Sequence, residues 1–420
     1  MKNWITYLLF LIILTRVAES MANDSSVNKP SITPIGIASW TSGKMYNPRD
    51  PFDYRRWNQS MVGIMGVKSQ VSPRLNTMIA LRAIEFLNRA DALHDTKEKI
   101  SLSQVYGKLA IGGSPQQPWF NLIGGLTNYN YHTHTRHLGE YLLRSGAYVP
   151  FLVNDVDYAQ YKALGAQINR SFLDGKLKND ILMTSERETR PHGDFSLAYV
   201  VSYAPSPFFE FGAGVNFRRL FPLSLKKLEK NMRPYPLYDE RDSLVIEDGD
   251  TLTYTTQGTV LMARAMFDPK PFLKGVPLGE KDLQLYSEIA LLGVKNYGTV
   301  YDNRKERMPM MAGIHLPAFG FIDIVAFEIE YYGNPNRLNP DGKPISKPDD
   351  YSKKDDWRWA IYAKHEILPG FTVTAIAASD HWRYSLNEDG RLEERTLSTD
   401  QWHWKIKIAY DLGRSGLSYR

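Results

Sequence analysis

The chain has 420 residues, a formal net charge of +5 at pH 7, 12% aromatic residues and no cysteine. The lack of cysteine excludes disulfide staples, thiolate metal sites and a cysteine nucleophile, and so weak a basic charge does not imply a nucleic-acid partner. Many aromatic residues without long apolar runs favour a β-protein with one apolar face.

The first 22 residues have the pattern of a cleaved signal peptide. Lys2 provides a positive start, residues 4–14 are an unbroken apolar run, and small residues at 18–22 offer cleavage patterns. The run is shorter than the about 20 residues that a transmembrane helix needs, although an uncleaved anchor is the alternative. No later run reaches that length. The mature chain is therefore either soluble or crosses a membrane as a closed β-barrel.

Alternation of apolar with small or polar residues recurs along the chain and predicts strands. Between residues 195 and 203, Phe195, Leu197 and Tyr199 share one face, while small residues share the other. Following this period predicts about 16 strands, an even number as in bacterial barrels. They lie near 34–40, 60–69, 75–86, 101–111, 118–131, 163–173, 177–187, 195–203, 208–218, 253–267, 282–294, 307–316, 321–332, 357–367, 371–382 and 402–412.

Two features of these segments favour a membrane barrel over a soluble β-sandwich. Many are about 10–13 residues long, which suits a tilted membrane crossing. Aromatic residues gather at their ends, where a membrane-interface girdle would lie. The predicted girdle consists of Tyr331, Tyr332, Trp357, Trp359, Trp402, Trp404 and Tyr410.

The connections alternate between short and long, as in outer-membrane barrels with short periplasmic turns and long external loops. Short ones are predicted at 174–175, 204–207, 317–320 and 368–370, and long ones at 219–251, 295–306, 333–356 and 383–401; the piece 268–281 is intermediate.

The predicted fold class is therefore all-β, a transmembrane antiparallel up-and-down barrel of about 16 strands, within a range of 14–18. Residues 1–22 are the signal peptide, 23–33 a periplasmic leader, 34–413 the barrel and 414–420 a C-terminal tail. Two alternatives stay open: a secreted soluble β-protein, and a helix over 77–93, whose apolar spacing fits either period.

The last strand, WHWKIKIAYDL (402–412), is similar to the terminal strand that the barrel-assembly machinery reads, although Lys407 stands where glycine is usual and residues 413–420 extend past it. The chain also resembles uncharacterised porin-like outer-membrane barrels of Gram-negative bacteria. The stretches that carry the resemblance are HLGEYLLRSGAYVP (137–150), DILMTSERE with HGDFSLAYVVSY (180–203), GTVLMARAMFDPK (258–270), DLQLYSEIALLGVKNY (282–297) and ERMPMMAGIHLPAFGFIDIVAFEIEYYG (306–333). The resemblance implies a fold and an outer-membrane location, and it names no cargo.

A barrel of this size leaves an aqueous lumen, and its inward faces would carry charges of both signs. The alternative is a solvated wall behind a plug. The predicted pore-lining residues are Glu210, Arg218, Arg264, Glu288, Glu328, Glu330, Arg358, Lys364, Glu366, Lys405 and Lys407.

The connection 132–162 follows the fifth predicted strand. In general porins the loop at this position folds inward and narrows the pore, so the same position here implies a constriction loop. An outward loop or an extra strand is the alternative. Its apolar content indicates that it packs against another surface. Its candidate charged residues are Arg136, Glu140, Arg144, Asp155 and Asp157.

Other chemistry has little support. His132, His134 and His137 cluster in the same connection, but spacing fixes no third metal ligand, so neither a metal nor a cofactor is predicted. Nucleophile-elbow, metalloprotease, P-loop and dinucleotide motifs are absent, and the adjacent Asp380 and His381 would point to opposite faces of a strand.

The sequence thus predicts a non-enzymatic porin-like channel for passive diffusion of small hydrophilic solutes. A structural or surface-interaction barrel without an open pore is the alternative, and a barrel-borne hydrolase a more distant one. The expected partners are outer-membrane lipid and the barrel-assembly machinery, and a homotrimer is an open option because porin-like barrels are often trimers.

Overall fold

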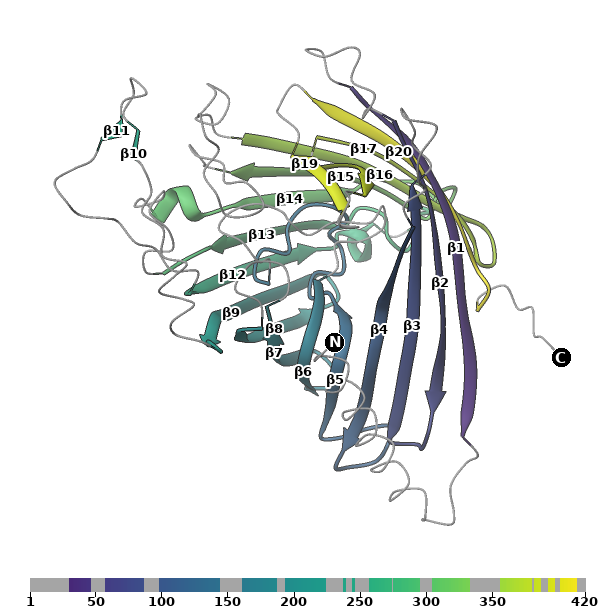
Figure 1. Ribbon diagram of the computed structural model, residues 1–420, viewed down its shortest axis with the longest axis vertical. Helices are drawn as coiled ribbons and strands as arrows, with labels where there is room; N and C mark the ends of the chain where they lie inside the picture. The colour runs from purple at the N-terminus through teal and green to yellow at the C-terminus, as the bar shows by residue number, and fades with distance from the viewer. Residues whose placement is uncertain are drawn as a thin grey trace.

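The computed structural model describes residues 30–46, 57–86, 98–143, 161–186, 193–223, 237–238, 244–245, 257–273, 275–294, 304–332, 356–379, 381–386, 392–396 and 401–413. Within these ranges, 16 strands form one closed antiparallel barrel (Figure 1). In order around the barrel they are β1 (Ser31–Tyr46), β2 (Trp57–Gln70), β3 (Leu75–Phe86), β4 (Glu98–Ile111), β5 (Phe120–Tyr129), β6 (Tyr161–Phe172), β7 (Leu177–Ser185), β8 (Phe195–Ser206), β9 (Phe209–Phe221), β12 (Gly258–Phe267), β13 (Leu285–Leu291), β14 (Met310–His315), β15 (Ile324–Tyr332), β16 (Asp356–Leu368), β17 (Phe371–Ala378) and β20 (Trp402–Asp411).

The barrel closes because the first strand pairs with the last. Lys44 of β1 lies opposite Trp57 of β2 on one side and Trp404 of β20 on the other. Closure leaves no strand edge with unpaired backbone groups, which is what a barrel needs in order to reside in lipid.

Side chains alternate between the two faces of the wall. Ala198 and Val200 of β8 are 1% and 2% exposed, whereas their neighbour Tyr199 is 40% exposed. On β9, Phe209 and Phe211 are exposed while Glu210 between them is half-buried. The outer face is thus largely apolar over its middle, as lipid contact requires, and the inner face holds most of the polar groups.

The two ends of the barrel differ in their connections. Residues 71–74, 173–176, 207–208 and 369–370 make short turns at one end, the turn end. Connections 130–160, 222–257, 292–309, 333–355 and 379–401 lie at the other, the loop end. Connection 268–284 is at the turn end and contains the 3-10 turn η2 (Lys270–Phe272), while η3 (Arg304–Arg307) precedes β14 at the loop end.

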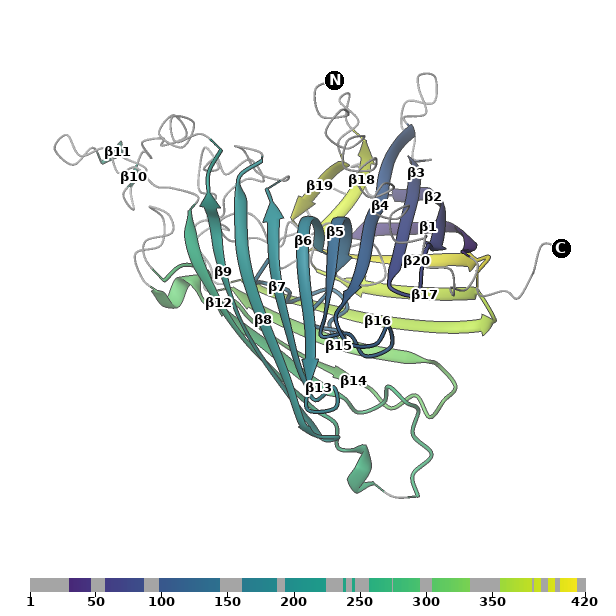
Figure 2. The same ribbon diagram turned by 90° about the horizontal axis from the view of Figure 1, so that it is seen from below.

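Two short hairpins lie outside the barrel sheet. One pairs β10 (Leu237–Tyr238) with β11 (Leu244–Val245), and the other pairs β18 (His381–Leu386) with β19 (Leu392–Thr396). Strand β18 follows β17 in the chain but contacts β2 and β3. In the order of strands around the barrel, β20 and β1 lie between β17 and β2. The second hairpin therefore leans inward from the loop end of β17 (Figure 2).

The predicted fold class is confirmed, and each of the predicted strands overlaps one barrel strand. The helix considered for 77–93 is wrong for its described part, because Leu75–Phe86 is β3; residues 87–93 lie outside the described ranges. Strand β1 is longer than predicted, and β13 and β14 are shorter. The signal peptide, most of the leader and the tail 414–420 also lie outside those ranges.

Aromatic rings pack together near the loop end of adjoining strands. Tyr331 and Trp357 have ring centroids 5.0 Å apart, and Trp402 lies 6.4 Å from Trp359 and 6.0 Å from Tyr46. Trp404 meets Trp57 edge-on at 6.4 Å, Tyr410 lies near the turn end, and the side chain of Tyr332 is outside the described set. A girdle role for these residues stays a prediction.

In the described part of the chain, no helix combines the length and apolarity that a membrane crossing demands.

A glycine on the inner face of β5 sets how closely β4 and β5 can pair. Gly125 has φ +126°, and a Cβ built there would lie 2.1 Å from the carbonyl oxygen of Val105. We expect Gly125→Val to lower the free energy of unfolding by about 1–3 kcal/mol, because the backbone is strained for any residue with a side chain. The fraction of protein that migrates as a folded, heat-modifiable barrel on a gel should decrease, and so should the midpoint temperature of thermal unfolding. Gly63→Val is the control, because nothing lies within 4 Å of a Cβ at Gly63. Equal behaviour of the two variants would contradict the prediction.

Candidate functional site: the lumen and its inward segment

The chain that follows β5 turns into the barrel instead of extending away from it (Figure 1). Residues 130–143, here called the inward segment, are almost entirely buried, with His132, Leu138 and Leu142 at 0% exposure. The groups that cover the segment belong to the barrel interior. The hydrogen bonds of the segment identify them as inward side chains of β9, β13 and β15.

Glu328 of β15 receives the first part of the segment. Its carboxylate accepts the backbone N–H of Arg136, that of His137 at 2.9 Å and that of Leu138 at 3.1 Å. The hydroxyl of Tyr286 on β13 donates to the same carboxylate at 2.8 Å. These four bonds supply the hydrogen-bond donors that a carboxylate needs when it is only 1% exposed.

Glu288 of β13 receives the next part. It accepts the backbone N–H of Glu140 at 3.1 Å and of Tyr141 at 2.8 Å, together with the hydroxyl of Tyr131 at 2.7 Å. The Tyr131 hydroxyl also accepts the N–H of Leu142 at 3.0 Å. Burial and the neighbouring Glu288 carboxylate raise the pKa of Tyr131 well above its usual value, so the phenol stays protonated and donates.

Glu330 completes the set. It accepts the hydroxyl of Tyr141 at 2.7 Å and, more distantly, the N–H of Gly139 at 3.4 Å. Six consecutive N–H groups, those of residues 136–141, thus point at three carboxylates. The left-handed backbone at Gly139 (φ +90°) and Glu140 (φ +60°) curls the chain so that successive N–H groups converge, which creates an anion-binding concavity.

Apolar packing holds the other side of the segment. Leu138, Tyr141 and Leu142 belong to one buried cluster that includes Val200 of β8 and Val260 of β12. The amide of Asn216 on β9 donates to the carbonyl of Leu142 at 2.9 Å. The segment is therefore fixed to the wall from β8 to β15 by both polar and apolar contacts.

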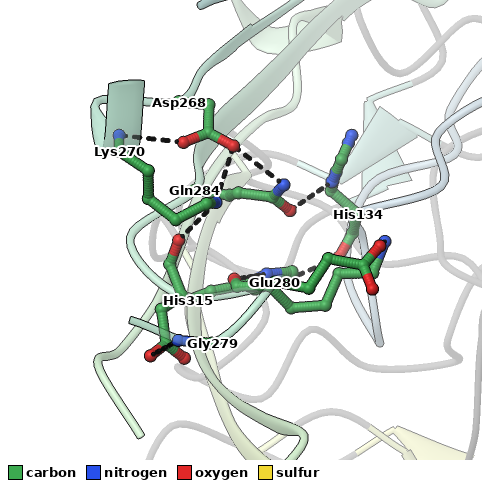
Figure 3. Close-up of polar contacts among 9 residues, drawn as sticks. His134, Asp268, Lys270, Gly279, Glu280, Gln284 and His315 are labelled. Carbon is green, nitrogen blue, oxygen red and sulfur yellow. Dashed lines mark hydrogen bonds and ion pairs between the residues drawn. The ribbon is translucent and has the colours of Figure 1, made fainter. Parts of the chain in front are cut away.

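The turn end holds the segment through a chain of side chains shown in Figure 3. His134 Nδ1 lies 2.9 Å from Gln284 Oε1, and the Gln284 amide donates to Asp268 at 3.2 Å. Lys270 forms an ion pair with Asp268 at 2.6 Å, and its ammonium also donates to a backbone carbonyl of the 268–284 connection at 2.8 Å. Nε2 of His315 lies 3.4 Å from the carbonyl oxygen of His134.

The protonation states follow from these surroundings. Burial lowers the pKa of His134 to about 4 and that of His132 well below its usual value. Burial alone would raise the pKa of Asp268, but hydrogen bonds from Lys270 and Gln284 outweigh it and leave that pKa lowered. At neutral pH the two histidines are therefore uncharged and the aspartate is ionised.

The predicted pore-lining residues differ in what they contact. Glu288, Glu328 and Glu330 bind the inward segment as described. Arg264 Nη2 pairs with Glu210 at 2.6 Å. Arg218 is buried on β9, and the Arg358 guanidinium on β16 donates to the carbonyl of Ser379 at 3.1 Å. The other predicted residues are half-buried on the inner faces of β16 and β20; they are Lys364, Glu366, Lys405 and Lys407.

The predicted constriction residues are only partly described. The Arg136 guanidinium donates to the carbonyl of Thr133 at 2.9 Å, and the Glu140 carboxylate accepts the N–H of His132 at 3.1 Å. Both side chains are buried and bond within the segment itself. Arg144, Asp155 and Asp157 lie outside the described residues.

Sequence reasoning missed the tyrosines and the turn-end contacts. Tyr286 could have been placed on the inner face, because it lies two residues before Glu288 on a predicted strand. Tyr131 and Gln284 lie at the ends of predicted strands, and Asp268 lies just after one. The alternation of apolar and polar residues therefore did not mark them as inward side chains. Among the described residues there is no group of three or more His, Cys, Asp or Glu that could hold a metal ion.

Comparisons with known proteins add a similarity of structure only. No family model matches the chain, and no curated protein matches it in sequence. Solved structures that are similar include engineered variants of the porin of Rhodopseudomonas blastica. Two of them each cover 91% of this chain and 100% of their own, with a TM-score of 0.47 and identities of 8% and 7%.

The carboxylate of Glu328 is expected to hold the inward segment in place. Glu328→Ala removes the acceptor for three consecutive N–H groups and leaves them buried, at a cost of about 1–3 kcal/mol each if water does not enter. We expect faster hydrogen exchange at residues 136–138, measured by mass spectrometry in detergent. Glu280→Ala is the control, because that carboxylate lies on the surface of the turn end. Unchanged protection at 136–138 would show that the segment is held by other contacts.

The neutral state of His134 makes the segment sensitive to acid. Its pKa is about 4 in the folded protein against 6.5 without the fold, so the unfolded state binds more protons between these values. The stabilisation is complete above pH 6.5 and decreases as the pH falls toward 4, by at most about 3 kcal/mol. Protease cleavage within 130–143 should therefore increase over this interval. His134→Asn should flatten the pH dependence, whereas His365→Asn, a partly exposed histidine on β16, should not.

Proposed function

We propose that this protein is an outer-membrane channel through which small hydrophilic solutes diffuse passively, with the inward segment narrowing the lumen. The observation that carries the proposal is the fixed position of residues 136–141 inside a closed 16-strand barrel. Barrels of about 16–18 strands leave an aqueous channel, whereas about 8 strands leave room only for side chains or one small ligand.

The placement of the inward segment supports the proposal that it narrows the lumen without filling it completely. The segment is bonded to the wall from β8 to β15, and none of its described hydrogen bonds reaches the strands β1 to β4. On that other wall, Lys68 and Lys108 point inward and are exposed, so space remains beside them. Solutes would pass between the segment and this wall.

The residues predicted to line the pore take two roles in this proposal. Glu288, Glu328 and Glu330 anchor the segment, while Lys364, Glu366, Lys405 and Lys407 face the solute path. Arg136 and Glu140 shape the segment from within, so its constricting surface is formed by its backbone and packed side chains.

The location that we propose is the outer membrane of a Gram-negative bacterium, reached by export under residues 1–22. The apolar outer face and the aromatic rings at the loop end support a membrane setting. Strand β20 would serve the barrel-assembly machinery, and a homotrimer is an assembly that the sequence resemblance to porin-like barrels leaves open.

One observation favours a second function. The hairpin of β18 and β19 lies against β2 and β3 from the loop end, where it could cover the mouth. A barrel closed in this way would be a structural or surface-interaction protein without an open pore. Bilayer recording distinguishes the two functions, because only an open pore gives discrete current steps.

Deletion of residues 136–157 should widen the channel. We expect a larger single-channel conductance than that of the intact protein in a planar bilayer, because the deletion removes the part of the segment bound to Glu288 and Glu328. Heat-modifiable migration on a gel must first show that the deleted protein still forms a barrel. Equal conductance would contradict the narrowing, and a folded intact protein without current steps would contradict the channel function itself.

A further inference from the structure

Two connections at the turn end form one unit, here called the turn-end lobe, which consists of residues 268–284 and 316–323. The carboxylate of Asp282 joins them, because it accepts the N–H of Gly279 at 2.7 Å and that of Phe319 at 3.0 Å. Asp282 is only 1% exposed, so the lobe has a buried polar centre.

Other polar side chains of the lobe are directed at the barrel interior. Gln284 lies two residues before the inward Tyr286, and its side chain meets His134 of the inward segment at 2.9 Å (Figure 3). Asp268 accepts the Gln284 amide at 3.2 Å and pairs with Lys270 at 2.6 Å. One side of the lobe is therefore polar, and it is turned toward the inward segment.

The apolar side chains of the lobe are exposed instead. Leu316 follows the inward His315, and its N–H still donates to the carbonyl of Val325 at 2.7 Å, so it continues the outer face of β14. Phe272 is 62% exposed and Phe321 is 81% exposed. The large exposed apolar residues of the lobe are Phe272, Leu273, Val276, Leu316, Phe319, Phe321 and Ile322. A group of this kind marks a surface that contacts an apolar partner.

The apolar surface of the lobe is continuous with the outer face of the barrel. The ring of Phe272 stacks on that of Phe208, in the turn between β8 and β9, with centroids 4.3 Å apart. The next residue, Phe209, stacks on Phe267 of β12 at 5.0 Å and on Phe211 at 6.0 Å, and these rings belong to the outer face. Phenylalanine rings thus extend from the lipid-facing side of β9 and β12 to the lobe.

The barrel strands next to the lobe are short. A tilted strand needs about 9–11 residues to cross a membrane, whereas β13 and β14 have 7 and 6. Pairing continues a little past them, because the N–H of Leu283 donates to the carbonyl of His315 at 2.9 Å. The lipid-facing wall still needs more apolar surface at this place, and the apolar residues of the lobe adjoin the turn end of both strands.

The backbone of the lobe is suited to a lipid environment, where each N–H needs a partner within the protein. The N–H groups of Phe272, Leu273 and Phe321 donate to carbonyls three residues earlier, at 3.0, 2.9 and 2.9 Å. Prolines, which have no N–H, stand at positions 269, 271, 277 and 317. The two most exposed phenylalanines of the lobe therefore carry backbone donors that are already bonded.

Exposed charges limit how deeply the lobe can lie in lipid. The carboxylate of Glu280 is almost fully exposed and lies 3.9 Å from the ammonium of Lys281. Asp323, about half exposed, lies 3.5 Å from the ring of His365. Because a carboxylate in hydrocarbon without water is very costly, this edge of the lobe belongs among the lipid headgroups.

We propose that the apolar side of the turn-end lobe inserts among the acyl chains next to the lipid headgroups, where it completes the lipid-facing wall beside β13 and β14. This inference rests on the membrane location in the proposed function. Lipid is the partner that the observations favour, because the apolar residues continue the outer face, adjoin short strands and have bonded backbone donors. Interfacial segments bury their apolar side about 5–10 Å into the boundary between headgroups and acyl chains.

Quenching of a fluorescent label tests this contact. The chain has no cysteine, so Phe272→Cys and Phe321→Cys each place a single bimane label on the lobe. In phosphatidylcholine nanodiscs, which leave both membrane faces open to solutes, brominated lipid should quench both labels about as strongly as a label at Phe211→Cys on the outer face of β9. Bromine near the headgroup should quench them more than bromine near the chain end. Aqueous iodide should quench them only weakly, but should strongly quench the control labels at Glu280→Cys and, in the short turn 173–176, Asp174→Cys.

Each outcome decides a separate point. Strong iodide quenching with weak lipid quenching at Phe272 and Phe321 would overturn the inference and leave the membrane location standing. Shielding from both quenchers would overturn it too, because protein, such as a second copy of the chain, would then cover the lobe. A label at Phe211 that brominated lipid does not quench would overturn the membrane location and the inference with it, whereas the channel function is judged by current steps alone. Val276→Cys replaces either lobe variant that fails to show heat-modifiable migration.

Discussion

The interior of this barrel depends on one arrangement, in which three buried carboxylates receive the backbone N–H groups of residues 136–141. Neither partner is stable there alone. A buried carboxylate without donors is costly, and so is a run of buried N–H groups without acceptors. Each satisfies the other, so the inward segment and the wall of β13 and β15 form one unit. The tyrosines Tyr131, Tyr141 and Tyr286 fill remaining acceptor positions of the carboxylates and bring apolar rings into the same space.

The same arrangement removes negative charge from the surface that water reaches. Glu288, Glu328 and Glu330 are 2%, 1% and 0% exposed, because the segment covers them. Each carboxylate meets the positive ends of N–H or hydroxyl dipoles instead of water, and these dipoles stabilise a buried anion.

The turn end adds a second point of support. The turn-end residues 268–284 are bound to His134 at the base of the segment through a chain of side chains, formed by Lys270, Asp268 and Gln284 (Figure 3). The wall is short at this place, because β13 and β14 have 7 and 6 residues. The folded connection at the turn end and the inward segment thus reinforce the part of the barrel where ladder hydrogen bonds are fewest.

The sequence by itself determined the strands and their faces, because an alternating pattern needs only the two-residue period of the backbone. It therefore predicted all of the barrel strands, and it placed Glu288, Glu328 and Glu330 on the inner face. It did not determine which acid meets which donor. Glu328 and His137 are 191 residues apart in the chain, and only the closed barrel brings them together. The tertiary structure decided that these glutamates are covered anchors rather than open charges, because burial depends on where the segment lies, and no local pattern encodes that position.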